Sequence, residues 1–187
     1  MAESKNNVIT YGLSGKVGDL IVFRNRGGKT FVSSKPKERT GEPSESQKHH
    51  QERFQEAIFY AKAAIADPTS KTAYEEAVSG GQTAYNVAVA DFFHAPDIKS
   101  VDLSKYAGNE GNTIVVRVTD DFKVTGVAVS IYNADGSEVE SGQAVQDANG
   151  IDWTYTATVG NESLEGDRIV IRAYDLPGNA TQAEKNL

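Results

Sequence analysis

The second half of the chain constrains the fold most, because apolar and polar residues alternate there in short segments separated by turn signals. Clear examples are residues 114–118, 127–131, 153–157 and 168–172. A period of two places successive side chains on opposite faces of a strand, so each segment predicts a strand with one buried face. Ala134-Asp135-Gly136 is a strong hairpin turn between two of them. Such a series of short strands predicts two antiparallel sheets packed on each other.

Seven strands are expected in this half, over residues 98–103, 112–119, 125–132, 137–145, 152–158, 168–174 and 180–185. Trp153, the single tryptophan, lies in the middle of one of them, where a large aromatic side chain is normally buried. The alternation also predicts which side chains point inward. These are Ile114, Val116, Val118, Val127, Val129, Ile131, Trp153, Tyr155, Ile169 and Ile171.

The first half predicts a small β-unit. A strand is expected over residues 17–23 and its partner over 30–32, joined by a turn at 25–28 whose two glycines accept positive φ. An isolated hairpin is marginal in water, so it must pack on the helices that follow or on another subunit. A polar, basic linker with two prolines and a glycine follows over residues 34–43.

Helices are expected beyond the linker. Ser44 and Gln47 form a capping box, and the helix that they open ends at Asp67-Pro68. Shorter helices are expected over 70–78 and 83–93, and His94 to Asp97 is the expected domain junction. The apolar stripe of the first helix consists of Phe54, Ala57, Ile58, Ala61 and Ile65. The predicted fold class is an α+β module over residues 1–95, with a hairpin and two or three helices, followed by an all-β sandwich over 96–187.

Charge is distributed unevenly along the chain, whose net charge is −7. Residues 1–48 hold nine Lys and Arg against five Asp and Glu, whereas residues 94–187 hold seven against fifteen. The asymmetry suggests that the basic end meets an acidic surface, which another copy can supply. Ordinary solvated surface is the alternative.

Composition also limits location and chemistry. No run approaches the ~18 apolar residues of a membrane helix, so we expect no membrane insertion. Residues 1–7 are polar and lack the apolar core of a secretion signal, which predicts a cytoplasmic protein or part of a released particle. The chain has no cysteine and three histidines, and His49 and His50 do not share a helix face. We therefore predict that the protein is not an enzyme and has no cofactor, apart from the calcium considered below.

Two resemblances cover most of the chain. Residues 12–23, with Gly-Lys-Thr-Phe-Val at 28–32 and Ser34-Lys35-Pro36, resemble uncharacterised proteins found widely in Bacteroidota. In that group the hairpin precedes a helix with a Gln and an Arg-Phe pair, here Gln47 and Arg53-Phe54.

The second half, which contains Asp175-Leu176-Pro177-Gly178-Asn179, is similar to bacterial immunoglobulin-like modules. That similarity implies an immunoglobulin-like sandwich. Modules of this kind occur in surface proteins and in phage or phage-tail-like particles, which implies a structural role by analogy of fold.

A calcium site is the most specific small-ligand hypothesis. In an immunoglobulin-like topology the start of the first strand lies at the same end as two of the loops, and calcium binds several oxygen ligands from such loops. The alternative is that these residues serve only to form turns. A calcium- or carbohydrate-binding adhesion module is therefore one functional hypothesis. The residues concerned are Asp97, Asp120, Asp121, Asp175 and Asn179.

The leading hypothesis is a non-enzymatic structural or adaptor protein that assembles with identical copies or docks on a larger particle, such as a phage or phage-tail-like particle, through its N-terminal module. The apolar residues expected in the interface are Leu20, Val22, Phe23, Phe31 and Val32. The basic residues expected there are Arg24, Arg26, Lys35 and Lys37. The alternative is a nucleic-acid-binding module that uses the same basic hairpin and linker, although the overall negative charge opposes it.

Overall fold

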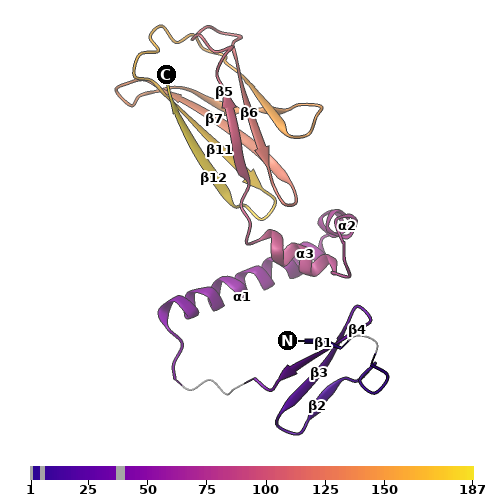
Figure 1. Cartoon of the computed structure of the whole chain (residues 1–187). Helices are drawn as coiled ribbons and strands as arrows, with labels where there is room; N and C mark the ends of the chain where they lie inside the picture. The colour runs from indigo at the N-terminus through magenta and orange to yellow at the C-terminus, as the bar shows by residue number, and fades with distance from the viewer. Residues whose placement is uncertain (1, 5–6, 37–40) are drawn as a thin grey trace. The chain divides into compact units, whose positions relative to one another are not determined.

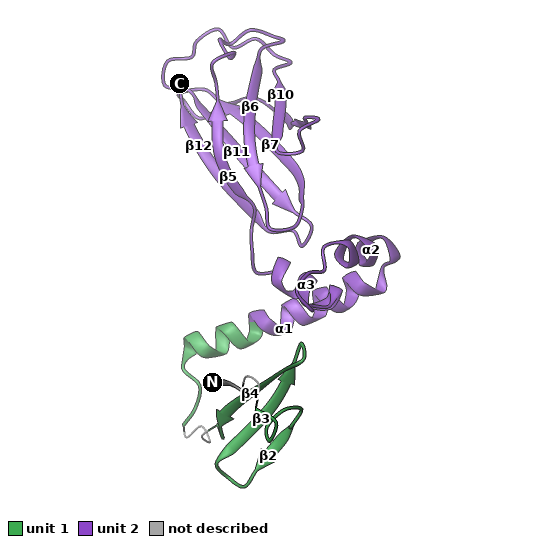
Figure 2. Cartoon of the chain, turned by 45° about the vertical axis from the view of Figure 1, so that its right-hand side comes forward, with its two compact units in different colours: residues 1–52 green, residues 53–187 purple. Residues whose placement is uncertain are grey.

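Three helices and three antiparallel sheets make up the part of the chain that the computed structural model describes, residues 2–4, 7–36 and 41–187 (Figure 1). Most of the regular structure is β, in the α+β mixture expected from the sequence. Contacts divide the chain into two units, residues 1–52 and 53–187 (Figure 2). The division falls inside the first helix rather than at the change from helices to strands near residue 95.

The first unit contains a four-stranded sheet, the N-terminal sheet, with strand order β1-β4-β3-β2. Its strands are β1 (Ala2–Ser4), β2 (Gly15–Val17), β3 (Ile21–Arg26) and β4 (Lys29–Ser34). The expected single strand over 17–23 is wrong, because the chain turns at residues 18–20 and Gly18 has φ +56°. Leu20 therefore lies in a turn. The expected turn is shorter than predicted and occupies Gly27 and Gly28, both with positive φ.

The helices are α1 (Glu45–Ala66), α2 (Pro68–Glu76) and α3 (Ala84–Asp91). The predicted capping box is present: the Ser44 N–H donates to Gln47 Oε1 (3.1 Å) and the Gln47 N–H donates to Ser44 Oγ (3.3 Å). The second helix begins at Pro68 rather than at residue 70, because proline is well suited to the first turn and Asp67 caps it.

The predicted stripe of α1 is confirmed at its centre. Ala57 and Ala61 are fully buried, and Ile58 and Ile65 are half-buried. Phe54 is exposed, although its ring stacks on Phe93. The buried centre of the helical core consists of three alanines and one tyrosine, contributed by all three helices: Ala61, Ala64, Tyr74 and Ala88.

Two further sheets form the rest of the second unit. One has the order β5-β6-β10-β9 and consists of β5 (Asp97–Asp102), β6 (Thr113–Thr119), β10 (Asp152–Thr156) and β9 (Val145–Gln146). The other has the order β12-β11-β7-β8 and consists of β12 (Ala180–Asn186), β11 (Arg168–Asp175), β7 (Val124–Tyr132) and β8 (Glu138–Gln143).

One apolar cluster draws residues from both sheets, and all ten side chains predicted to point inward belong to it. The predicted strand over 137–145 is two strands that belong to different sheets. β8 pairs with β7, whereas β9 pairs with β10. The change occurs at the buried Ala144, whose N–H donates to the Val127 carbonyl (2.7 Å).

Candidate functional site

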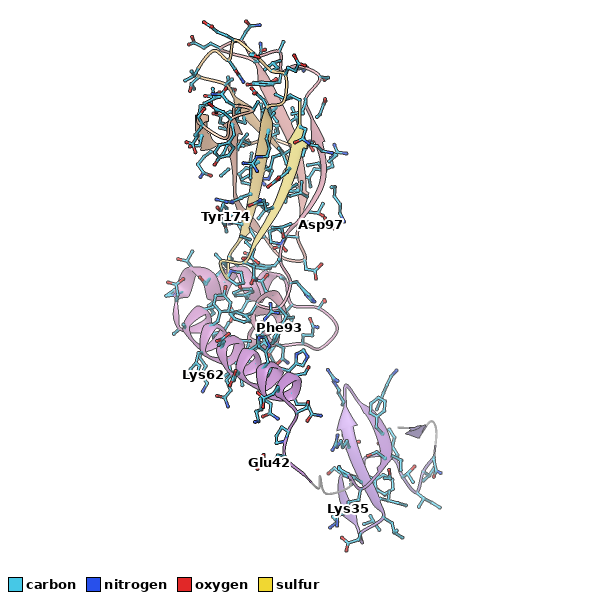
Figure 3. All side chains as sticks on the ribbon, turned by 90° about the vertical axis from the view of Figure 1, so that its left-hand side faces the viewer. Lys35, Glu42, Lys62, Phe93, Asp97 and Tyr174 are labelled. Atoms are coloured by element: carbon cyan, nitrogen blue, oxygen red, sulfur yellow. The ribbon has the colours of Figure 1, made fainter. Side chains whose placement is uncertain are left out.

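The N-terminal sheet has almost no core of its own. Among the described side chains of the first unit, in residues 7–36 and 41–52, Thr30 alone is buried. Large apolar side chains are exposed instead: Val8 is 93% exposed, Leu20 77% and Val17 57%. Side chains from both faces of this sheet can be followed in Figure 3. A sheet that buries so little apolar surface has little to stabilise it by itself.

The pairing register divides the sheet into two chemically different faces, because directly opposed residues of antiparallel strands share a face. One face has no ionisable side chain in the described part of β2, β3 and β4. We call it the neutral face; it consists of Gly15, Val17, Ile21, Phe23, Asn25, Thr30, Val32 and Ser34. The other, the basic face, consists of Lys16, Val22, Arg24, Arg26, Lys29, Phe31 and Ser33.

One end of the neutral face is covered by the loop at residues 7–14. The Gly12 N–H donates to Thr30 Oγ1 (3.2 Å), and Asn25 Nδ2 donates to the Gly12 carbonyl (2.9 Å). Thr30 Oγ1 in turn donates to Asn25 Oδ1 (2.8 Å). These bonds explain why Thr30 is buried. The other end stays open, with Val17 exposed and Ile21 still 38% exposed.

The basic face carries both paired and unpaired cations among the described residues. Lys16 pairs with Asp19 (2.5 Å), and Lys35, just after β4, also reaches Asp19 (3.1 Å). These two ammonium groups lower the pKa of the Asp19 carboxyl. Arg24 and Arg26 have no ion pair with another residue in the described part of the chain. The excess positive charge therefore lies at the hairpin end of the face.

The residues predicted to form an assembly interface divide between the two faces. The register places Phe23 and Val32 on the neutral face. It places Val22, Phe31, Arg24 and Arg26 on the basic face. Leu20 lies in the exposed turn before β3. Lys35 follows β4, and Lys37 lies outside the described residues.

The interface predicted from the sequence did not include Val17 and Ile21, which are exposed on this sheet. They form a cross-strand pair on the neutral face. The turn at Gly18 is the signal that could have separated the two strands and paired these residues. Once β2 and β3 are antiparallel, the side-chain period of two fixes the faces.

The calcium candidates are partly brought together. Asp97, Asp120 and Asp121 line an open hollow of about 490 Å³. One oxygen of each carboxylate has a protein partner: Asp97 pairs with Lys99, Asp121 Oδ2 lies 2.9 Å from His94 Nδ1, and Asp120 Oδ2 accepts from the Lys123 N–H (2.9 Å).

The remaining two calcium candidates bind each other. Asp175 accepts from the backbone N–H of Asn179 (2.6 Å) and from its Nδ2 (2.7 Å). Across the described ranges, no group of three or more His, Cys, Asp or Glu side chains is placed to hold a metal ion. These contacts are turn hydrogen bonds and charge pairs within the chain.

A buried polar cluster joins the helices to the sheets within the second unit, and sequence reasoning did not find it. Asp91, at the end of α3, is 3% exposed, and its Oδ2 accepts from the Tyr74 hydroxyl (2.5 Å). The Tyr74 and Tyr60 hydroxyls lie 2.6 Å apart. Asp91 Oδ1 and Asp120 Oδ1 are buried without a hydrogen-bond partner. We call Asp91, Tyr74, Tyr60 and Asp120, with Asp175 and Asn179, the junction cluster.

The junction cluster also connects the helices to the loops of the two-sheet domain by direct contacts. Asn179 Nδ2 donates to the carbonyls of Phe92 (3.2 Å) and His94 (3.3 Å), just after α3. The Phe122 ring stacks on Tyr74 with 4.3 Å between centroids. Hydrogen bonds and apolar packing thus both cross from the helices to the loops of the sheets.

Burial raises the pKa of Asp91 to about 6, and the nearby carboxylates of Asp120, Asp175 and Asp121 add to the increase, while the Tyr74 hydrogen bond opposes it. Burial likewise raises the pKa of Asp175. A perturbed carboxyl can mark a catalytic site. Here the Asp91 carboxyl is 3% exposed and its Oδ2 accepts from a phenol hydroxyl, so the group links α3 to α2.

Comparisons with known proteins add little. The sequence matches no protein-family model and no curated protein. One solved structure, the crystal structure of an engineered protein from a structural genomics consortium, has 15% sequence identity and a TM-score of 0.33. The match covers 58% of this chain and 30% of the engineered one, so the chain spans less than a third of that protein's length. None of the described helices is long and apolar enough to cross a membrane.

Proposed function

We propose that the chain is a non-enzymatic structural or adaptor protein whose N-terminal sheet attaches it to identical copies or to a larger protein assembly. The second unit is the part that it presents. The observation that carries this proposal is the N-terminal sheet itself, which exposes apolar side chains on an open face while the second unit has a complete core.

The energetics of a small sheet support an intermolecular role. Ordering each residue costs about 1–2 kcal/mol of backbone entropy, and units below ~40 residues usually need disulfides, metals or oligomerisation. The chain has no cysteine, so disulfides are excluded. Burying an exposed Val or Ile side chain contributes about 1.5–3 kcal/mol. A protein partner that covers Val17, Ile21 and Leu20 would supply the missing stabilisation.

The order of strands supports an immunoglobulin-like sandwich as the presented domain. Taking β5, β6 and β7 as strands A, B and C, and β11 and β12 as F and G, the orders β5-β6-β10-β9 and β12-β11-β7-β8 correspond to ABED facing GFC. β8 then stands as an additional strand beside C. Domains of this architecture serve mainly as binding or spacing modules, a role inferred from fold alone.

The proposal is tested by comparing the 187-residue chain with a chain that lacks residues 1–41. We expect light scattering to give a multimer for the longer chain, or sedimentation in extracts of the producing cells to place it in a larger particle. The shorter chain should be a free monomer in both measurements. An unchanged mass and unchanged sedimentation after truncation would contradict the proposal.

A second candidate, nucleic-acid binding, rests on the basic face. Arg24 and Arg26 lie there without acidic partners in the described structure, beside the half-buried Phe31. The second unit opposes this candidate, since residues 53–187 hold twenty Asp and Glu against ten Lys and Arg. Retention of the chain on DNA or RNA at low salt, lost as salt rises and absent in an Arg24→Ser, Arg26→Ser variant, would favour it.

A further inference from the structure

We propose that the neutral face of the N-terminal sheet packs on the neutral face of a second copy of the same chain, which gives a two-fold symmetric dimer. This inference rests on the proposed function and deepens it, because it names both the surface and the partner. It concerns one face of one sheet. The opposite, basic face stays free for a different contact.

Charge decides which of the two faces can meet itself. In a two-fold contact each residue faces the same small set of residues on the other copy. Two basic faces would bring Arg24 and Arg26 of both copies together, and opposed like charges are destabilising. The neutral face has no ionisable side chain in its described strands. It is the face that a second copy can cover without placing like charges in contact.

The open end of the neutral face forms one continuous apolar patch. Val17 is directly opposite Ile21 across β2 and β3, and Phe23 is directly opposite Val32 across β3 and β4. Gly15, opposite Phe23, adds no side chain and leaves room beside the ring. Sheets that pack face to face interdigitate such side chains at a separation of about 10 Å.

The loop that covers the other end of this face extends the apolar surface. Val8, Ile9 and Tyr11 belong to it and are almost fully exposed. Gly12 in the same loop is hydrogen-bonded to Thr30 and Asn25, which fixes the loop over the face. A second copy that covers the face would therefore also meet this loop.

A second copy suits this surface better than an unrelated partner. Apart from the exposed Ser34, the polar residues of the described face are Asn25 and Thr30, which are hydrogen-bonded to Gly12 of the loop and to each other. The patch therefore offers few polar groups that would select a different molecule. A self-complementary contact needs only apolar surface without charge. The contact would cover the neutral face of both copies at once. Association and stable folding of the N-terminal sheet would therefore be coupled.

A matched pair of variants in the 187-residue chain tests the choice of face. Ile21→Lys places a cation on the neutral face, and Val22→Lys places one on the basic face of the same strand at the next position. We expect the unmodified chain and Val22→Lys to give twice the 20.1-kDa chain mass by light scattering. Ile21→Lys should give a monomer. Loss of the dimer in Val22→Lys with retention in Ile21→Lys would overturn the inference.

Cross-linking provides a second measurement that does not depend on disrupting the sheet. Because the chain has no cysteine, Val32→Cys and Ser33→Cys each introduce a single thiol, on the neutral and basic faces respectively. We expect a short bis-maleimide to yield covalent dimers of Val32→Cys at least tenfold more efficiently than of Ser33→Cys. Equal yields, or the reverse preference, would contradict a contact between neutral faces.

The two proposals can fail separately. A 187-residue chain that is monomeric at high concentration, yet sediments with a larger particle unless residues 1–41 are removed, would overturn the second-copy contact and leave the structural role standing. A chain that is monomeric and unaffected by the truncation in both measurements would overturn both.

Discussion

The strands of the two-sheet domain and those of the N-terminal sheet have similar patterns and opposite burial. In β6, Ile114, Val116 and Val118 are covered completely by the facing sheet. In β3, Ile21 and Phe23 alternate in the same way, but no second layer of the described first unit covers them. The comparison teaches that alternating apolar residues are enough to predict a strand. Whether the apolar face of that strand contributes to stability depends on a second layer that covers it.

The largest effect should come from removing a core side chain in the covered layer. Ile171→Ala leaves a cavity among fully buried residues and is expected to cost about 2–5 kcal/mol of the free energy of unfolding. Urea unfolding followed by Trp153 fluorescence measures it. The matched change in the open layer, Ile21→Ala, should leave that transition within about 0.5 kcal/mol. Equal losses would contradict the difference between the two layers.

The second largest effect on stability is expected at the junction cluster, which joins helices and sheets within the second unit and has no counterpart in the described part of the N-terminal sheet. The pKa of Asp91 is about 6 in the folded chain, against 3.8 as the ordinary value. The folded state therefore holds this proton more tightly than the unfolded state. The stabilisation from Asp91 is complete below about pH 4 and is lost as pH rises through 6. Since one pKa unit corresponds to 1.36 kcal/mol, the effect is roughly 2–3 kcal/mol.

Asp91→Asn removes this titration and should retain a hydrogen bond from Tyr74. We expect the variant to be more stable than the unmodified chain at pH 7.5, with the difference shrinking or reversing towards pH 4. Thermal unfolding from pH 4 to 8 measures it. Asp97→Asn, which changes an exposed carboxylate that pairs with Lys99, is the control. The same pH trend in Asp97→Asn would refute the assignment to Asp91.

The smallest effect is expected where α1 passes from one unit to the other. Its first turn is exposed and is held by the capping box and a Lys48–Glu45 pair. Ser44→Ala should cost about 1 kcal/mol of local helix stability. Hydrogen exchange should accelerate at residues 46–48 and stay unchanged at 57–64, where α1 is packed. Acceleration along the whole helix would mean that its first turn also supports the packed part.

Much of the two-sheet core could be predicted from the sequence, because the side chains of a strand alternate between its two faces with a period of two. The ten predicted core residues are all buried or nearly so. The split of the segment 137–145 between two sheets was not predictable, since the segment contains no proline and no Asn-Gly or Asp-Gly pair that would end one strand and begin another. What separates β8 from β9 is the choice of neighbouring strand, which only the three-dimensional pairing supplies.

The candidate sites were harder to predict for the same reason. Residues 17–23 read as one strand because they are rich in apolar side chains, and the positive φ of Gly18 is what ends β2. The faces of the N-terminal sheet appear only once that turn is known. In the junction cluster, Tyr60, Tyr74 and Asp91 are 14 and 17 positions apart along the chain. No local pattern connects them.

The crossing of the chain at Ala144 has a mechanical consequence. One uninterrupted stretch is hydrogen-bonded to β7 on one side of the residue and to β10 on the other. Because no loop separates β8 from β9, sliding one sheet past its partner would strain the backbone at this point. A force applied along the strands of one sheet is therefore transmitted to the other sheet through the continuous backbone at Ala144.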